Sequence, residues 1–153
     1  MATQKRVWLF RDGNRSLRDL LGGKGANLAE MMNIGLPVPP GFTITTDACR
    51  EYLTTGIVPA QLHDQIHVSL ANLEKIVGKN FGDASNPLLV SVRSGAKHSM
   101  PGMMETVLNV GITPEVADAM AKSSGNEKFA WDSYRRFIDM FGRIVCDLPD
   151  ETV

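Results

Sequence analysis

The chain has 153 residues, of which 43% are hydrophobic and 22% charged, and its formal net charge at pH 7 is −1. This length suits a single domain with a sizeable core, and the composition is ordinary for a globular protein. The near-zero charge provides no general attraction to nucleic acid or to an anionic membrane, so an anionic ligand would need locally placed cations.

The sequence contains nothing that resembles a targeting or membrane-spanning segment. No apolar stretch of signal-peptide length follows the first residues, and no run approaches the roughly 18 apolar residues of a membrane helix. Cys49 and Cys146 are isolated and form no CxxC pair, so we expect two reduced core residues rather than a disulfide. We therefore expect a cytoplasmic protein that binds neither nucleic acid nor a membrane.

The first part of the chain predicts a strand and then a helix with a glycine-rich start. Residues 7–10 predict a short strand, and apolar spacing predicts a helix over residues 26–34. Gly22 and Gly23 precede this helix and would expose unpaired N–H groups at its positive end, where Lys24 adds a full charge. The spacing is not that of a P-loop. On these residues alone, a turn with a solvated Lys24 is the simpler interpretation.

The next part of the chain predicts one strand and two helices. Alternation predicts a strand over residues 42–45, and Thr46 or Asp47 can cap a helix that runs to about residue 53. The second helix should have Pro59 in its first turn. Its buried stripe should consist of Leu62, Ile66, Leu70, Leu73 and Val77.

Two histidines on that second helix have a spacing at which they could bind a metal ion. His63 and His67 lie four residues apart, and such a pair can in principle hold a metal ion. No HExxH arrangement surrounds them, however, and no cysteine or third histidine is near in the sequence. We therefore expect a solvated helix face and no metal site in this chain.

The stretch from residue 88 to residue 106 is the most informative part of the sequence. Residues 88–92 form an apolar run between turn signals, which predicts a buried strand, and Arg93 follows at its carboxyl end. Open α/β sheets bind ligands at that end of their strands. The next residues mix glycines, hydroxyls and cations, and glycine lets the main chain approach a polyanion closely. The alternative is a surface loop in which Arg93 pairs with a carboxylate.

The last third of the chain predicts a strand and two helices. Residues 107–110 predict the strand, residues 114–122 a short helix, and Asn126 caps a longer helix with apolar and aromatic residues at helical spacing. We expect that stripe to be core. The basic residues of the long helix should be solvated or ion-paired, and they are Arg135, Arg136 and Arg143.

Several stretches together resemble the pyruvate phosphate dikinase family. They are residues 21–31 (LGGKGANLAEM), 91–96 (SVRSGA), 99–106 (SMPGMMET) and 134–138 (YRRFI), in the family's order through nearly the whole chain. Phosphoenolpyruvate synthases and rifampicin phosphotransferases share the general plan, but residues 100–106 are closer to the dikinase. The resemblance implies an α/β (α+β) fold, the first half of an ATP-grasp nucleotide-binding domain with a mixed sheet and flanking helices. Residues 1–153 would be the amino-terminal subdomain of a longer enzyme whose remainder is absent.

The resemblance also implies a role in phosphoryl transfer. The family converts ATP, pyruvate and phosphate to AMP, phosphoenolpyruvate and diphosphate, through a histidine on a separate domain outside this chain. The residues that would contact the ATP phosphates are Lys24, Arg93, Gly102, Met103 and Thr106. None would be catalytic, Mg²⁺ would be held by acids of the absent half, the parent enzyme would be a homo-oligomer, and the chain alone would be inactive. The alternatives are a phosphoenolpyruvate synthase-type enzyme and a truncated, non-catalytic binding module.

Overall fold

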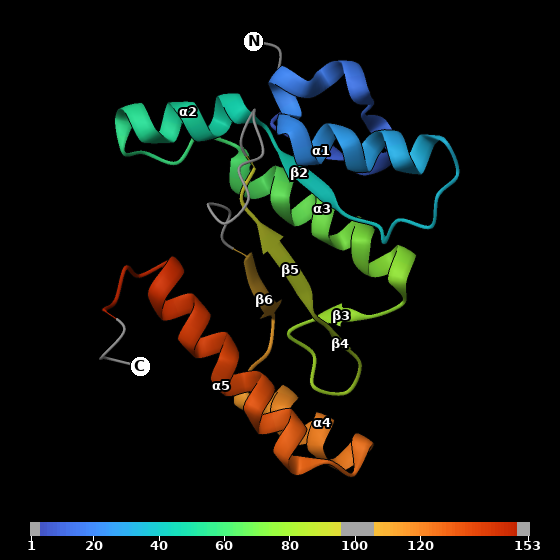
Figure 1. The fold of residues 1–153 in the computed structure, drawn as a ribbon, viewed down its shortest axis with the longest axis vertical. Helices are drawn as coiled ribbons and strands as arrows, with labels where there is room; N and C mark the ends of the chain where they lie inside the picture. The colour runs from blue at the N-terminus through green and yellow to red at the C-terminus, as the bar shows by residue number, and fades with distance from the viewer. Residues whose placement is uncertain (1–3, 96–105, 150–153) are drawn as a thin grey trace. The chain divides into compact units, whose positions relative to one another are not determined.

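The computed structural model describes residues 4–95 and 106–149. These residues divide into two compact units, which we call the first unit (residues 4–77, with Gly95) and the second unit (residues 78–94 and 106–149). Both units contain helices and strands (Figure 1), so the predicted mixture of α and β structure is confirmed. In the described ranges, no helix has both the length and the apolarity required to span a lipid bilayer.

The first unit is built on one antiparallel strand pair. β1 (Val7–Leu9) pairs with β2 (Phe42–Ile44), and Trp8 lies opposite Thr43. The helices of this unit are α1 (Arg18–Asn33), α2 (Thr46–Thr55) and α3 (Leu62–Val77), and two short 3₁₀ turns precede α1. α1 contacts β2 (Figure 1), and α3 contacts β1. The buried cluster consists of Val7, Ala48 and Leu62, with Phe42 and Ile66 packed against it.

One side chain of α3 bonds to the backbone at the start of β1. Gln65 Oε1 accepts hydrogen bonds from the backbone N–H groups of Arg6 and Val7, at 2.7 and 3.1 Å. The Nε2 group of the same side chain donates to the carbonyl oxygen of Gln4 at 2.8 Å. The Gln65 amide therefore satisfies backbone groups that would otherwise need water or another strand.

The second unit contains the remaining strands and two helices. β3 (Asn80–Phe81) pairs in parallel with β4 (Pro87–Leu88), and β5 (Val90–Arg93) pairs antiparallel with β6 (Thr106–Val110). α4 (Pro114–Ser124) and α5 (Glu127–Ile144) pack on each other, and α5 also contacts β6. The core cluster consists of Ile112, Val116 and Ala117. Across the described residues of both units, the strands form three separate pairs.

Several helix ends follow the predicted signals. Gly35 follows α1 with a φ of 82°, a left-handed conformation that ends the helix without the steric cost that a side chain would add. Asn126 caps α5, because its side-chain oxygen accepts a hydrogen bond from the Phe129 N–H at 3.0 Å. Both predictions are confirmed.

Two helix starts were predicted wrongly. Thr45, rather than Thr46 or Asp47, caps α2, because the Thr45 hydroxyl accepts from the Ala48 N–H. Thr45 has an extended backbone, with φ of −66° and ψ of 151°, which is the usual conformation of a residue just before a helix. Pro59 does not lie in the first turn of α3, because that helix begins three residues later at Leu62.

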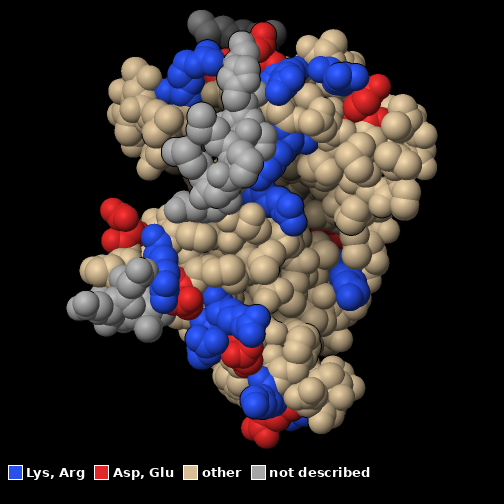
Figure 2. All heavy atoms as spheres, viewed as in Figure 1, with Lys and Arg blue, Asp and Glu red and all other residues tan. Residues whose placement is uncertain are grey.

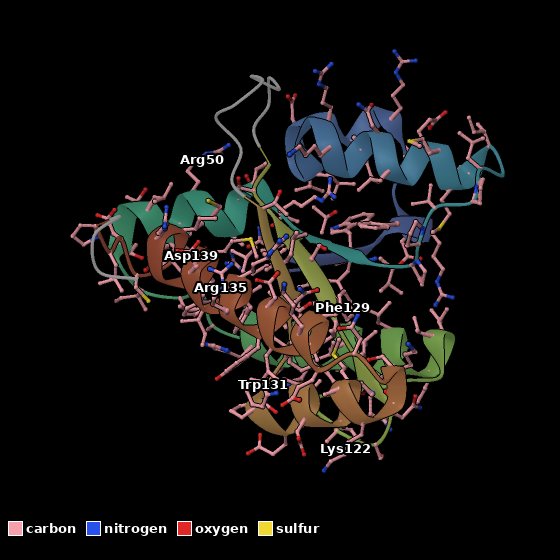
Figure 3. The ribbon with its side chains drawn as sticks, turned by 60° about the horizontal axis from the view of Figure 1, so that its bottom comes forward. Arg50, Lys122, Phe129, Trp131, Arg135 and Asp139 are labelled. Carbon is pink, nitrogen blue, oxygen red and sulfur yellow. The ribbon has the colours of Figure 1, made fainter. Side chains whose placement is uncertain are left out.

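Burial is lower than the sequence predicted at four places, one of which is Val77, the last residue of the predicted α3 stripe, which is exposed. Cys49 and Cys146 are free thiols, as expected, but both are exposed. β5 is not a buried strand, since Val92 is 54% exposed. The apolar stripe of α5 is only partly core: Ala130 is fully buried, whereas Ile138 is 44% exposed. The reason for the last difference is that α4 and β6 cover one side of α5 (Figure 3) and leave the rest of the stripe uncovered by described residues.

The polar face of α5 agrees with prediction. Asp132 lies 3.0 Å from Arg135 and 2.7 Å from Arg136, and Asp139 lies 2.7 Å from Arg143. Basic and acidic side chains accordingly alternate over this helix in Figure 2. The three arginines are therefore ion-paired within their own helix, as expected.

Candidate functional site

The glycine-rich start of the predicted helix is a break inside α1. Gly22 has φ of 72° and ψ of 170°, a non-helical conformation within Arg18–Asn33, and it is buried. This region of conformational space is almost exclusive to glycine. A second helical run therefore begins at Gly23, and the first turn of such a run carries the partial positive charge that attracts anions.

Close packing against β2 holds this second run in place. A Cβ atom at Gly25 would lie 2.9 Å from both Cγ2 and Oγ1 of Thr43 and 3.2 Å from the Cβ of Leu21. Because a real Cβ almost never comes so close to other heavy atoms, the glycine is needed for the approach of α1 to β2. The strand pair therefore positions the helical start that follows Gly22.

Lys24 is the second residue of this run and is half-buried. Within residues 4–95 and 106–149, no carboxylate forms an ion pair with its ammonium group. A lysine at the positive end of a helix adds a full charge to the partial charge of the backbone. Lys24 and the first turn after Gly22 thus form one cationic feature, which lies in the first unit.

Arg93 and Thr106 form a second feature, in the second unit. Arg93 ends β5, Thr106 begins β6, and the two are direct partners in the antiparallel ladder. Directly opposed residues share one face of a sheet, with Cβ atoms about 4.5–5.5 Å apart. A guanidinium donor and a hydroxyl therefore rise from the same face at the end of the hairpin. Arg93 is exposed and Thr106 is half-buried.

The alternative role for Arg93, an ion pair with a carboxylate in a surface loop, finds no support in the described part of the chain. None of the carboxylates there forms an ion pair with its guanidinium group, unlike the arginines of α5. An arginine offers several N–H donors in a planar fork, which suits the oxygen atoms of phosphate. Arg93 therefore keeps its donors available toward an anion as far as the described residues are concerned.

Two of the predicted phosphate-binding residues lie outside the described residues: Gly102 and Met103. Of the other three, the structure brings Arg93 and Thr106 together in the second unit, and it places Lys24 in the first. Sequence reasoning missed Asn109, which has a left-handed backbone at the register shift between β5 and β6. Its signal was an asparagine inside an apolar strand pattern, where that residue is uncommon.

The described residues do not offer a metal site. They contain no group of three or more histidine, cysteine, aspartate or glutamate side chains that could hold a metal ion. His63 and His67 are both exposed on α3. Mg²⁺ needs oxygen ligands, usually including carboxylates, and the described residues do not gather such a set.

Comparisons with known proteins identify relatives of the chain. Residues 18–72 and 53–130 match the family model described as "Pyruvate phosphate dikinase, AMP/ATP-binding domain". Pyruvate, phosphate dikinase of Clostridium symbiosum is 53% identical over 146 residues, which are 95% of this chain and 17% of that protein. Chloroplastic pyruvate, phosphate dikinase 1 of Oryza sativa subsp. japonica is 55% identical over 152 residues, covering 96% of this chain and 16% of its own. Pyruvate, phosphate dikinase of Rhizobium meliloti (strain 1021) is 54% identical over 141 residues, which are 92% of this chain and 16% of that protein. The chain thus spans less than a fifth of the length of these relatives.

Proposed function

Because the chain belongs to the AMP/ATP-binding domain family of pyruvate phosphate dikinase, we propose that it binds the phosphates of ATP. The groups that we assign to this task are Lys24, Arg93, Gly102, Met103 and Thr106. The observation that carries the proposal is the pairing of Arg93 with Thr106 at the end of the β5–β6 hairpin. That pairing presents a cationic fork and a hydroxyl from one face.

The assigned residues divide the work by their chemistry. Arg93 donates planar, paired hydrogen bonds to phosphate oxygens, whereas Lys24 acts as a point charge beside a helix start. Thr106 contributes a hydroxyl donor. The backbone amides of Gly102 and Met103 would close over the γ-phosphate. Phosphoryl transfer needs the triphosphate held in line and its charge neutralised, and these groups supply part of both.

For the whole protein we propose the dikinase reaction: ATP, pyruvate and phosphate give AMP, phosphoenolpyruvate and diphosphate. Residues 1–153 would form the amino-terminal subdomain of its ATP-binding domain, and a histidine of another domain would carry the phosphoryl group. The Mg²⁺ ligands would come from outside this chain, and the parent enzyme would be a cytoplasmic homo-oligomer. The relatives described above are all dikinases, which supports this reaction over that of a synthase.

A titration of the chain with Mg-ATP tests the proposal. Because the assigned groups contact phosphates only, we expect a Kd of about 1 mM, or roughly 4 kcal/mol of binding free energy, and no release of AMP. Arg93→Ala should weaken binding about 10- to 150-fold, the effect of losing one charge-assisted contact worth roughly 1.5–3 kcal/mol. NMR chemical shifts of the backbone amides measure affinities in this range.

Arg135→Ala is the matched control for that titration. Arg135 is an exposed arginine of the same unit, paired with Asp132 on the solvated face of α5. Its loss removes the same charge from the second unit but should leave the Mg-ATP affinity unchanged. If the Arg93→Ala and Arg135→Ala variants bind Mg-ATP equally well, Arg93 does not belong to the site. The clearest contradiction would be that both variants bind as tightly as the original chain.

A further inference from the structure

The hairpin that carries Arg93 and Thr106 contains a register shift. Val90 pairs with Val110 but Val92 pairs with Val107, so one residue of β5 faces two residues of β6. Ser91 is the single residue, and Leu108 and Asn109 are the two. Asn109 has a φ of 58°, in the left-handed region. An extra residue in one strand with a left-handed backbone is a β-bulge, and bulges are frequent next to functional sites.

The bulge decides which residue faces Arg93. With regular pairing from Val90 and Val110 onward, Arg93 would lie opposite Val107 rather than opposite Thr106. A slip of one residue moves every following side chain to the other face of a strand pair. Thr106 would then leave the face of Arg93, and Val107, which is 6% exposed, would turn toward it. The extra residue therefore keeps Val107 buried and Thr106 beside the guanidinium at the same time.

Asn109 is suited to this conformation and is fixed by the core below it. Asparagine tolerates the left-handed region much better than β-branched residues do. The Asn109 carbonyl oxygen accepts a hydrogen bond from the Ile112 N–H at 3.0 Å, and Ile112 is 4% exposed in the core cluster of the second unit. The bulge is thus tied to the packing of that unit rather than to the end of the hairpin.

We propose that Asn109 is a positioning residue for phosphate binding, because its left-handed backbone sets the strand register that places Thr106 opposite Arg93. Asn109 acts through these two residues and needs no contact with the nucleotide itself. The inference rests on the proposed function of Arg93 and Thr106. It adds a residue that needs no contact with the phosphates, and it explains why an asparagine interrupts an apolar strand.

Substitutions at Asn109, compared in two measurements, test the proposal. The variants are Asn109→Gly, Asn109→Ala and Asn109→Val, in decreasing order of tolerance for a left-handed backbone. Cross-strand nuclear Overhauser effects between Arg93 and Thr106 measure the register. Chemical-shift titration with Mg-ATP measures the affinity. Leu108→Val is the control, since it places the same β-branched residue at the neighbouring, 42% exposed position, which has no positive φ.

Asn109→Gly and Leu108→Val should retain the Arg93–Thr106 contact and the affinity of the original chain. Asn109→Val should lose that contact, gain one between Arg93 and Val107, and bind Mg-ATP about tenfold more weakly, the effect of losing one phosphate contact. If Asn109→Val does not fold, Asn109→Ala is compared with Asn109→Gly. The alanine variant should then show a weaker Arg93–Thr106 contact and a lower Mg-ATP affinity than the glycine variant, by less than is expected for valine.

Two results would overturn the positioning role alone: an unchanged register in the valine and alanine variants, or a changed register with unchanged affinity. An original chain that shows no response to Mg-ATP, while its Arg93–Thr106 contact is present, would overturn the proposed function and with it the positioning role. The two failures are therefore distinguishable.

Discussion

Gly22→Ala tests whether the break in α1 exists and what it contributes. Gly22 has φ of 72° and ψ of 170°. A side chain in that region costs about 1–3 kcal/mol, and the lower entropy of the unfolded alanine chain returns about 0.4–1 kcal/mol. The expected net loss of stability is therefore about 1–2 kcal/mol. For a chain of this length, that loss corresponds to a decrease of roughly 2–8 °C in the melting temperature.

Urea denaturation followed by circular dichroism measures this loss. With an m-value of about 1–3 kcal/mol/M for a small protein, the midpoint should fall by roughly 0.3–2 M at unchanged m. Gly95→Ala is the control, because a Cβ there meets no atom of residues 4–95 or 106–149 within 4 Å and the backbone has no positive φ. It should leave stability unchanged or slightly higher. A Gly22→Ala variant as stable as the original chain would mean that α1 is continuous. Lys24 would then have no helix start beside it.

Substitutions at two further positions test a helix cap of the first unit and a turn of the second unit. Thr45→Ala should lower the free energy of unfolding by about 0.5–2 kcal/mol, because the hydroxyl that caps α2 is lost; Thr45→Ser should lose less, and equal losses in urea denaturation would contradict a capping role. The pKa of Asp83 is held below its ordinary value of 3.8 by hydrogen bonds from the side chain and backbone of Ser85. Its carboxylate therefore stabilises the fold above the unfolded pKa, and this contribution is lost as the pH falls through the folded pKa. Asp83→Asn should be less stable at pH 7, and its deficit in urea midpoint should shrink as the pH falls below 3.8; a deficit that is constant with pH would refute the assignment.

Two helix ends and the position of Arg93 at a strand end were predictable because they depend on local chemistry. Gly35 and Asn126 act through backbone conformations and hydrogen bonds that involve only neighbouring residues. Arg93 at the end of β5 followed from an apolar run that stops at a charge. These signals do not depend on the rest of the fold, so the sequence alone carries them.

The remaining features depend on partners that are distant in sequence. The strand pair that brings Arg93 opposite Thr106 contains a register shift at Asn109. An asparagine among apolar residues 107–110 hints at an irregularity, but it does not specify which residues become partners. The exposure of Cys49 depends on which side of α2 is covered, and periodicity cannot state that. The partial exposure of the α5 stripe likewise depends on which side of that helix is covered. Sequence spacing predicts that a face is apolar, whereas only the packed structure shows how much of that face is covered.

The side chain of Gln65 has a consequence for how the protein behaves at high concentration. A strand with an open edge invites pairing with the same strand of another molecule, which is a route to aggregation. By bonding to the backbone of Gln4, Arg6 and Val7, the Gln65 amide occupies backbone groups at the start of β1 without adding a strand. An incoming chain would have to displace hydrogen bonds that are already made. A single glutamine on α3 thus leaves fewer free backbone groups at the start of the amino-terminal strand for another molecule to pair with.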